Sequence, residues 1–149
     1  MLDPGRHLDD WNKPGNHRTD DTFEQVFSEA KSNTEFAADK RIVLRGRTTE
    51  VIEKIPNDAL DFACIDGDYT LKGFTIDLIN VYPKIRTGGW LGGDDFSSTI
   101  WQHDKKFEPT LVFPFAVYFV EAVGAPIYAL PNNQFIIKKT AMRSFDFID

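Results

Sequence analysis

Apolar and polar positions alternate along the chain in segments that predict strands and helices in turn. Residues 62–65 form an uninterrupted apolar run, which is typical of a parallel strand buried on both faces. Apolar residues at helical spacing follow between Leu71 and Tyr82, and Pro83 ends that pattern. A second buried strand is expected at residues 90–91. The alternation of strand and helix favours right-handed crossovers and a parallel α/β sheet.

Three further elements are expected before the first apolar run. A capping-box pattern precedes apolar residues at helical spacing and predicts a helix over residues 22–31. Residues 41–45 predict a short strand. A second helix, capped by Thr48 or Thr49, is expected to end before Pro56.

The last third of the chain begins with a polar segment, residues 96–107, that is typical of a loop over the edge of a site. Pro109 is a candidate first residue of a helix. Residues 126–130 and 134–138 then predict two strands, and the turn residues 131–133 between them predict an antiparallel hairpin.

Acidic residues follow both buried strands at the point where each strand ends. Asp66 comes directly after the first run, and Asp94 and Asp95 follow the segment around Trp90. Ligand sites of open α/β sheets lie at the carboxyl ends of the strands, so the three carboxylates are expected to converge if the two strands are neighbours. Carboxylates completed by water or substrate oxygens suit magnesium, although adjacent acidic residues are also typical of a solvated turn. Asp68 is predicted to be a cap or turn residue.

Composition places the chain among globular proteins. Its 149 residues are 42% hydrophobic, which allows one sizeable core, so residues 1–149 are expected to form a single domain or part of one. The net charge is −6 and the Lys and Arg residues are scattered, which disfavours nucleic acid as a partner. No run approaches the length of a membrane span, and a cytoplasmic location is expected.

Few other side chains are candidates for nucleophiles or metal ligands. Cys64, the single cysteine, lies inside the buried run, where a structural thiol is expected, and this usage fits a reducing compartment. His7, His17 and His103 have no metal-ligand spacing and are predicted to be surface residues. Of the three, His103 is the one near the acidic segments.

The segments IDGDY at 65–69, KIRTGG at 84–89 and GGDDF at 92–96 together resemble the fourth strand, its helix and the fifth strand of class I S-adenosylmethionine-dependent methyltransferases. These families contain small-molecule and sugar O-methyltransferases, and their parallel sheet also ends in an antiparallel hairpin. The resemblance implies a Rossmann-like sheet. It also implies truncation at the N-terminus, because nothing before Asp3 can supply the glycine-rich turn that follows the first strand in the family.

The resemblance implies a metal-assisted O-methyltransferase site. In metal-dependent members the matching acidic residues bind magnesium, which assigns Asp66, Asp94 and Asp95 as metal ligands. Asp66 is also a candidate proton acceptor, and the expected substrate is a small molecule with a reactive hydroxyl group. Many relatives carry a histidine or lysine where this chain has Tyr69, and tyrosine can orient a hydroxyl but is a poor base at neutral pH.

The cofactor implied by the resemblance is S-adenosylmethionine. Its contacts are expected at Asp3, which matches the acidic residue that holds the ribose in the family, at Gly46 and at Asp66. Because the glycine-rich turn has no counterpart here, the isolated chain is expected to bind S-adenosylmethionine weakly or not at all.

The sequence is also compatible with two other classes of function. One is a non-catalytic protein with a methyltransferase fold that does not bind the cofactor. The other is a metal-dependent phosphohydrolase that uses the same carboxylates, which the lack of a second acidic or histidine cluster disfavours.

Strand order in the resembling fold leads to a prediction about assembly. Its first and second strands separate the third strand from the fourth, so residues 41–45 would lie two strands away from the strand that contains Cys64. Unpaired edges and uncovered apolar faces are adhesive. We therefore expect the 41–45 strand to move beside the Cys64 strand, and a second chain to complete a homodimer.

Overall fold

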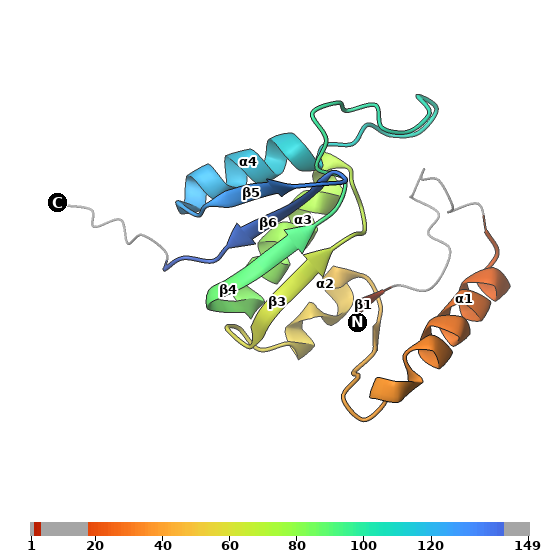
Figure 1. Cartoon of the computed structure of the whole chain (residues 1–149). Helices are drawn as coiled ribbons and strands as arrows, with labels where there is room; N and C mark the ends of the chain where they lie inside the picture. Colours follow the sequence, from red (N-terminus) through yellow and green to blue (C-terminus); the bar gives the residue numbers. More distant parts are fainter. Residues whose placement is uncertain (1, 4–17, 142–149) are drawn as a thin grey trace. The chain divides into compact units, whose positions relative to one another are not determined.

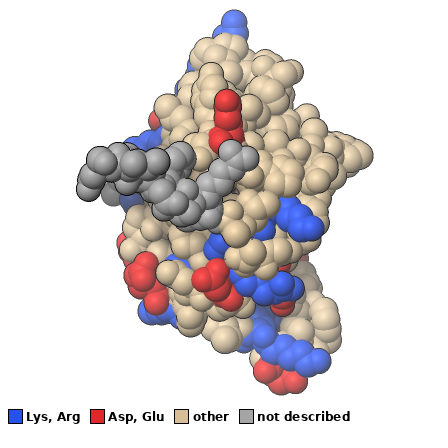
Figure 2. Space-filling view, turned by 90° about the vertical axis from the view of Figure 1, so that its left-hand side faces the viewer, with Lys and Arg blue, Asp and Glu red and all other residues tan. Residues whose placement is uncertain are grey.

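The structure is a computed structural model that describes residues 2–3 and 18–141. It divides into two compact units, unit 1 with residues 1–54 and 106–108, and unit 2 with residues 55–105 and 109–149. The single domain predicted from the chain length stays a prediction. In the described part of the chain, no helix has both the length and the apolar character needed to cross a membrane. Figure 2 shows one face of the molecule, where basic and acidic side chains are interspersed.

Unit 1 contains two short parallel strands and a long helix. Its elements are β1 (Leu2–Asp3), α1 (Asp20–Asn33), η1 (Glu35–Ala37), β2 (Leu44–Arg45), α2 (Thr48–Val51) and η2 (Ile52–Lys54), where η marks a 3-10 helix. Helix α1 confirms the predicted helix. It begins after Thr19, whose hydroxyl accepts a hydrogen bond from the Thr22 N–H, so it starts two residues earlier than predicted. Helix α2 is capped by Arg47, and the predicted caps Thr48 and Thr49 lie inside it.

The strand predicted at residues 41–45 is shorter than expected and pairs differently. Strand β2 pairs in parallel with β1, which places Leu44 opposite Leu2 and Arg45 opposite Asp3. Arg41 instead donates a hydrogen bond from Nη1 to the Lys31 carbonyl in the last turn of α1 (2.8 Å). The prediction that this segment pairs beside the Cys64 strand is therefore wrong. An apolar pattern identifies a strand but does not specify which strand it pairs with.

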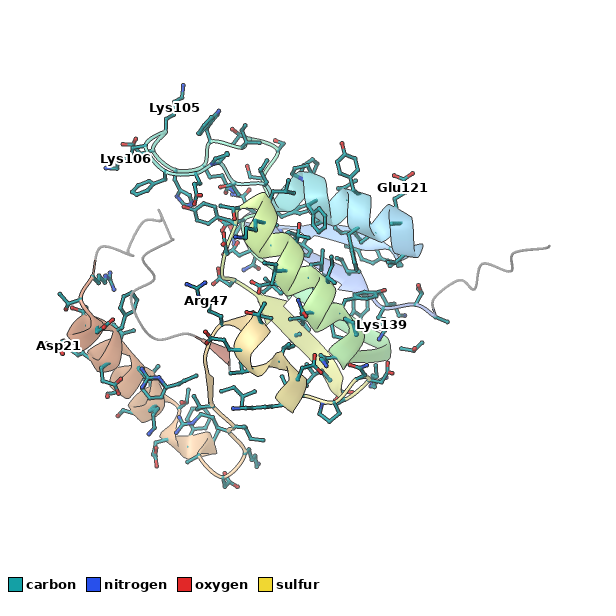
Figure 3. All side chains as sticks on the ribbon, turned by 180° about the vertical axis from the view of Figure 1, so that it is seen from behind. Asp21, Arg47, Lys105, Lys106, Glu121 and Lys139 are labelled. Atoms are coloured by element: carbon teal, nitrogen blue, oxygen red, sulfur yellow. The ribbon has the colours of Figure 1, made fainter. Side chains whose placement is uncertain are left out.

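Unit 2 is a four-stranded mixed sheet with two helices on one face. Its elements are β3 (Leu60–Ile65), α3 (Leu71–Val81), η3 (Tyr82–Lys84), β4 (Ile85–Gly93), α4 (Val112–Val123), β5 (Ile127–Leu130) and β6 (Gln134–Lys138). The strand order is β3-β4-β6-β5, with β3 and β4 parallel and the other two pairs antiparallel. Figure 1 views the sheet from the face without helices, and Figure 3 shows α3 and α4 in front of the opposite face. The predicted parallel pair and the antiparallel hairpin are both confirmed.

Local sequence explains where the elements of unit 2 begin and end. The Thr70 hydroxyl caps α3 by accepting a hydrogen bond from the Gly73 N–H (3.1 Å). Helix α4 begins at Val112, three residues later than predicted, so that Pro114 falls in its first turn, where a missing N–H costs nothing. The hairpin turn contains Asn132 and Asn133 with φ of 61° and 58°, the left-handed conformation that asparagine tolerates best after glycine.

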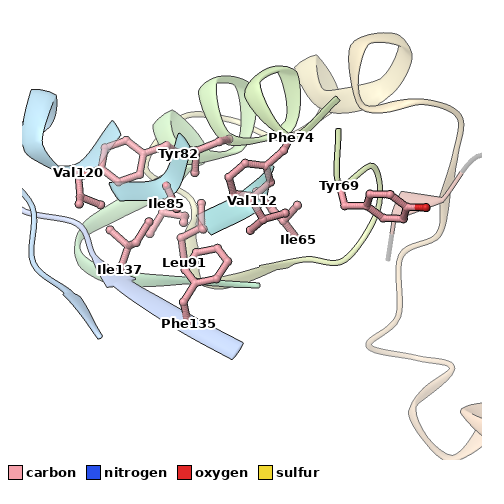
Figure 4. Close-up of a cluster of buried hydrophobic side chains, with 12 residues drawn as sticks. Ile65, Tyr69, Phe74, Tyr82, Ile85, Leu91, Val112, Val120, Phe135 and Ile137 are labelled. Atoms are coloured by element: carbon pink, nitrogen blue, oxygen red, sulfur yellow. The ribbon is translucent and has the colours of Figure 1, made fainter. Parts of the chain in front are cut away.

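The core of unit 2 lies between the sheet and the helices α3 and α4 (Figure 4). Phe74 of α3 is its centre, because its ring makes edge-to-face contacts with Phe115 of α4 and Phe135 of β6, with both pairs of ring centroids 6.1 Å apart. Leu91 and Ile137 are fully buried on the same face of the sheet. Tyr69 lies at one end of this cluster, with its hydroxyl pointing away from the other side chains (Figure 4).

Strand β3 is buried on one face only, so the prediction of burial on both faces is wrong. Ala63 and Ile65 face the core, whereas Phe62 is 56% exposed and Cys64 is exposed. The prediction that Cys64 is a buried structural thiol is therefore also wrong. We call the side of the sheet opposite α3 and α4 the open face, and its side chains include Phe62, Cys64, Trp90, Tyr128, Leu130 and Ile136.

Candidate functional site

The carboxyl ends of β3 and β4 bring acidic residues together, as predicted for neighbouring parallel strands. Ile65 and Gly93 are paired in register, so Asp66 and Asp94 leave the sheet at the same level. The Asp94 N–H donates a hydrogen bond to the Ile65 carbonyl (3.3 Å), which extends the strand pairing to the first acidic residue after β4. Two carboxylates from segments far apart in sequence are thereby held at one edge of the sheet.

Asp95 has a backbone conformation that few residues adopt. Its φ is 61°, its N–H donates a hydrogen bond to Oδ1 of Asp94 (2.9 Å), and its carbonyl accepts one from the Gln102 side chain (3.1 Å). Aspartate tolerates this left-handed conformation better than most residues, and such conformations are concentrated at functional sites. The turn fixes the directions in which Asp94 and Asp95 leave the strand.

The acidic residues line a small pocket. It is bordered by Ile65, Asp66, Gly67, Asp68, Tyr69, Phe74, Asp94, Asp95 and Val112, so the predicted metal ligands and Tyr69 border the same space. The space that these residues enclose is about 10 Å³, enough for about one water molecule, and the rest of the hollow is open to solvent. Pockets that enclose drug-sized ligands occupy about 300–1,000 Å³. The hollow is therefore too small to enclose a whole nucleoside cofactor.

The donor chemistry of the pocket suits a hard cation such as magnesium. Among residues 18–141, however, no three Asp, Glu, His or Cys side chains lie close enough together to hold a metal ion. Proteins usually bind magnesium through one or two carboxylates, and water or substrate oxygens complete the octahedron. The pocket fits this kind of site, and the set of Asp66, Asp94 and Asp95 as ligands stays a prediction.

Asp68 forms the turn before α3, as predicted. Its Oδ1 accepts hydrogen bonds from the backbone N–H of Thr70 (2.8 Å) and from the Thr70 hydroxyl (2.7 Å). Thr70 in turn caps α3. The sequence IDGDYT therefore separates two acidic roles, with Asp66 at the end of the strand and Asp68 in the turn that starts the helix.

His103 is not the surface residue that the sequence predicts. Its ring packs against Tyr69 with the ring centroids 4.8 Å apart, and its Nε2 atom is buried. His7 and His17, which carried the same prediction, lie outside the described residues. The Leu111 N–H donates to the Tyr69 carbonyl (2.8 Å), so the segment from 96 to 111 is held against the pocket on both sides of His103. The sequence pattern does not predict the contacts of Gln102 and His103, because an irregular loop has no periodicity that indicates which of its side chains are buried.

The proposed cofactor residues are divided between the two units. In unit 1, Asp3 and Arg45 are opposite each other at the ends of β1 and β2, and Gly46 follows directly, so Asp3 and Gly46 share one edge of that small sheet. A Cβ atom at Gly46 would lie 2.6 Å from Cγ1 of Val51, which explains the need for glycine at this turn. Asp66 belongs to unit 2. The set of Asp3, Gly46 and Asp66 as cofactor contacts stays a prediction.

The thiol of Cys64 reports on the charge of the pocket. Partial burial raises the pKa of Cys64 above its usual value, and the negative charges of Asp66 and Asp94 raise it further. Because the thiolate is the reactive form, these effects slow its reaction with alkylating reagents near neutral pH.

Replacing Asp66 with asparagine is expected to lower the pKa of Cys64 and to accelerate its alkylation by iodoacetamide at neutral pH. The matched control is Asp61→Asn, which removes an exposed carboxylate of the same strand that is paired with Arg86. Equal rates in the two variants would show that the Asp66 charge does not act on this thiol.

Comparisons with known proteins support the fold. No protein-family model and no curated protein sequence matches the chain. A crystal structure of a Corynebacterium glutamicum protein matches 97% of this chain and 61% of its own chain, with a TM-score of 0.64 and 15% identity. A candidate caffeoyl-CoA O-methyltransferase from Staphylococcus aureus matches 78% of this chain and 60% of its own, with a TM-score of 0.56 and 16% identity. The chain thus spans about three-fifths of the length of both proteins. Together with the parallel pair β3–β4, its acidic ends and the antiparallel hairpin, these likenesses show that the chain has a class I methyltransferase-like fold.

Proposed function

We propose that the pocket of unit 2 binds a divalent cation and the hydroxyl groups of a small-molecule substrate, as part of an O-methyltransferase-type site. The observation that supports this is the position of Asp66 and Asp94 at the same level of two paired parallel strands, bordering one pocket. Identities of 15% and 16% carry the fold alone, so the chemistry is argued from these side chains.

Four residues that border the pocket have roles in this proposal. Asp66, with Asp94 or Asp95, would hold the cation. A bound magnesium ion would supply a Lewis acid that lowers the pKa of a coordinated hydroxyl group. Asp66 would accept the proton from that hydroxyl. Tyr69 is 7% exposed and packs against His103, so its ring forms a rigid wall that orients the substrate. Two adjacent hydroxyls on the substrate would occupy two positions of the cation and fix the reacting oxygen.

The methyl donor in this proposal is S-adenosylmethionine, held mainly by groups outside the pocket. The pocket has too little volume for the whole cofactor. Asp3 and Gly46 are the candidate contacts in unit 1. The small volume of the pocket also supports the alternative of a non-catalytic protein. A pocket that binds a cation and a substrate transfers no methyl group unless a methyl donor is also bound.

The proposal predicts that magnesium stabilises the protein through the pocket. A ligand that binds only the folded state, at 100 times its dissociation constant, adds about 2.7 kcal/mol to the free energy of unfolding. We expect MgCl₂ to raise the melting temperature of the wild type above its value in EDTA, and Asp94→Asn to abolish that rise. Glu121→Gln is the matched control, because Glu121 projects from α4 into solvent (Figure 3). A wild type whose melting temperature does not respond to magnesium or manganese would contradict the proposal.

A second arm of the experiment tests the substrate class. Catechol carries two adjacent hydroxyl groups, whereas its isomer resorcinol cannot place both on one cation. In calorimetric titrations with MgCl₂ present, catechol is expected to bind the wild type more tightly than resorcinol. The difference should disappear in Asp94→Asn or in EDTA. Equal binding of the two isomers would remove the support for a cation that coordinates the substrate.

A further inference from the structure

His103 carries a buried nitrogen atom that the packing of unit 2 does not explain. Its Nε2 atom is buried, and within the part of the chain that the structure describes it has no hydrogen-bond partner. A polar atom in this state costs free energy, so native proteins seldom retain one without a function. His103 belongs neither to the buried core cluster nor to the residues that border the pocket. It is therefore a candidate for a role that the core and the pocket lining do not reveal.

The imidazole ring lies against a residue of the pocket. Its centroid is 4.8 Å from that of the Tyr69 ring, with 37° between the ring planes, so the two rings are in contact. Tyr69 borders the pocket together with Asp66 and Asp94, whereas His103 does not. An effect of His103 on a bound molecule is therefore expected to act through Tyr69.

The loop that carries His103 is closed at its base. The Thr110 N–H donates a hydrogen bond to the Ile100 carbonyl (2.7 Å), which joins the two ends of the loop. Next to His103, the Gln102 side chain donates to the Asp95 carbonyl (3.1 Å). These bonds hold the imidazole away from the water that would otherwise satisfy its nitrogen. The burial of this atom is thus built into the loop.

We propose that His103 is a positioning residue, which accepts a hydrogen bond from the Tyr69 hydroxyl when a substrate hydroxyl occupies the pocket. A tyrosine hydroxyl donates one hydrogen bond and accepts others, so Tyr69 can donate to Nε2 of a neutral His103 and accept from the substrate at the same time. Hydrogen bonds in such sites are often long or badly aligned in the free protein and tighten only in the complex. Because the two rings are already in contact, a side-chain rotation is sufficient to form this bond.

The chain of hydrogen bonds orients the substrate hydroxyl. Hydrogen bonds in series polarise one another, so the bond to His103 makes the Tyr69 oxygen a better acceptor for that hydroxyl. The proton of the hydroxyl still passes to Asp66, and His103 binds and orients only. This inference rests on the proposed function, because it concerns how the same site holds its substrate.

Titration calorimetry with catechol in the presence of MgCl₂ tests the inference. His103→Phe keeps a ring against Tyr69 and removes the nitrogen. It is expected to weaken catechol binding about tenfold, which corresponds to the loss of one hydrogen bond. Tyr69→Phe is expected to weaken binding at least as much. The double variant should bind like Tyr69→Phe alone, because both substitutions break one chain of hydrogen bonds.

Thr110→Val is the matched control. The Thr110 hydroxyl is also buried without a hydrogen-bond partner among the described residues, and valine removes it with little change of shape. This variant and His103→Phe are both expected to melt at or above the wild-type temperature, since each removes a buried polar atom that no group satisfies. Only His103→Phe should lose affinity for catechol, and its melting temperature should still rise with MgCl₂.

The imidazole nitrogen gives a second readout, which needs no variant of His103. In a ¹H–¹⁵N correlation spectrum of the three histidine rings, the Nε2 signal of His103 is expected to shift when catechol and MgCl₂ are added. The shift should be absent in Tyr69→Phe, whereas a purely structural ring contact would leave the signal unchanged in both proteins. His7→Gln and His17→Gln assign the signal by elimination.

The results that would overturn the inference can be told apart from failure of the proposed function. Equal catechol affinity in His103→Phe and the wild type, with the magnesium response intact, would refute the role of His103 alone. A shift of the Nε2 signal that persists in Tyr69→Phe would show that the imidazole does not act through Tyr69. A wild type that binds no catechol in the presence of magnesium would contradict the proposed function, and the inference with it.

Discussion

Replacing Phe74 with alanine is expected to lower the free energy of unfolding by about 3–5 kcal/mol, the range observed when a large aromatic side chain is removed from a core. Phe74 is 1% exposed, and its ring fills the space between the sheet and α4 through its contacts with Phe115 and Phe135. The two surrounding rings belong to different elements, α4 and β6, so they cannot collapse together into the cavity. Urea unfolding followed by near-ultraviolet circular dichroism measures the loss.

The matched control for this prediction is Phe36→Ala. Phe36 is 88% exposed, so the same chemical change there is expected to alter the free energy of unfolding by less than about 0.5 kcal/mol. Phe74 also borders the carboxylate pocket, and Phe74→Ala is expected to weaken any response to magnesium. A loss of stability of less than about 1 kcal/mol in Phe74→Ala would show that the core of unit 2 is not packed around this ring.

Replacing Gly93 with alanine is expected to destabilise unit 2 and to disturb the pocket at the same time. A Cβ atom at this position would lie 2.4 and 2.6 Å from two atoms of the Phe135 ring and 3.0 Å from the Ile65 carbonyl oxygen. The ring cannot move away, because Phe74 and Phe96 pack against it. Overpacking of this kind costs about 1–3 kcal/mol. Since Asp94 follows Gly93 directly, a shift of the strand end also moves the first carboxylate of the turn.

Gly67→Ala is the matched control for Gly93→Ala. Its Cβ atom would meet one carboxylate oxygen of Asp77 at 3.3 Å, and a side-chain oxygen can give way more easily than a buried ring. We expect this variant to change the free energy of unfolding by less than about 1 kcal/mol. Thermal melts of both variants with MgCl₂ and with EDTA separate the two effects. If Gly93→Ala melts like the wild type and responds equally to magnesium, the close packing at the end of β4 is not a requirement of the site.

The position of the acidic residues at one edge of the sheet could be predicted from the sequence, because the residues that determine it are close together in the chain. An apolar run followed immediately by Asp66, and a glycine-containing strand followed by Asp94 and Asp95, each place acidic groups at the end of a strand, and the parallel pair β3–β4 confirms that these ends meet. The His103 contact with Tyr69 could not be predicted in this way. It joins residues 34 positions apart through a loop whose conformation depends on the packing of the pocket.

Sequence alone determined the elements of unit 2, because side-chain periodicity, helix caps and turn residues act over a few positions. Thr70 starts α3 and the two asparagines at 132 and 133 reverse the chain between β5 and β6, wherever those elements pack. Tertiary structure alone decided what covers each element. The apolar pattern of β3 shows that both of its faces avoid water, but only the arrangement of α3 and α4 reveals that Ile65 is buried within the unit while Phe62 is exposed. Likewise, β2 pairs with β1 because strand pairing depends on which strands meet in space. The hydrophobic effect is non-directional, so an apolar pattern does not identify the surface that covers it.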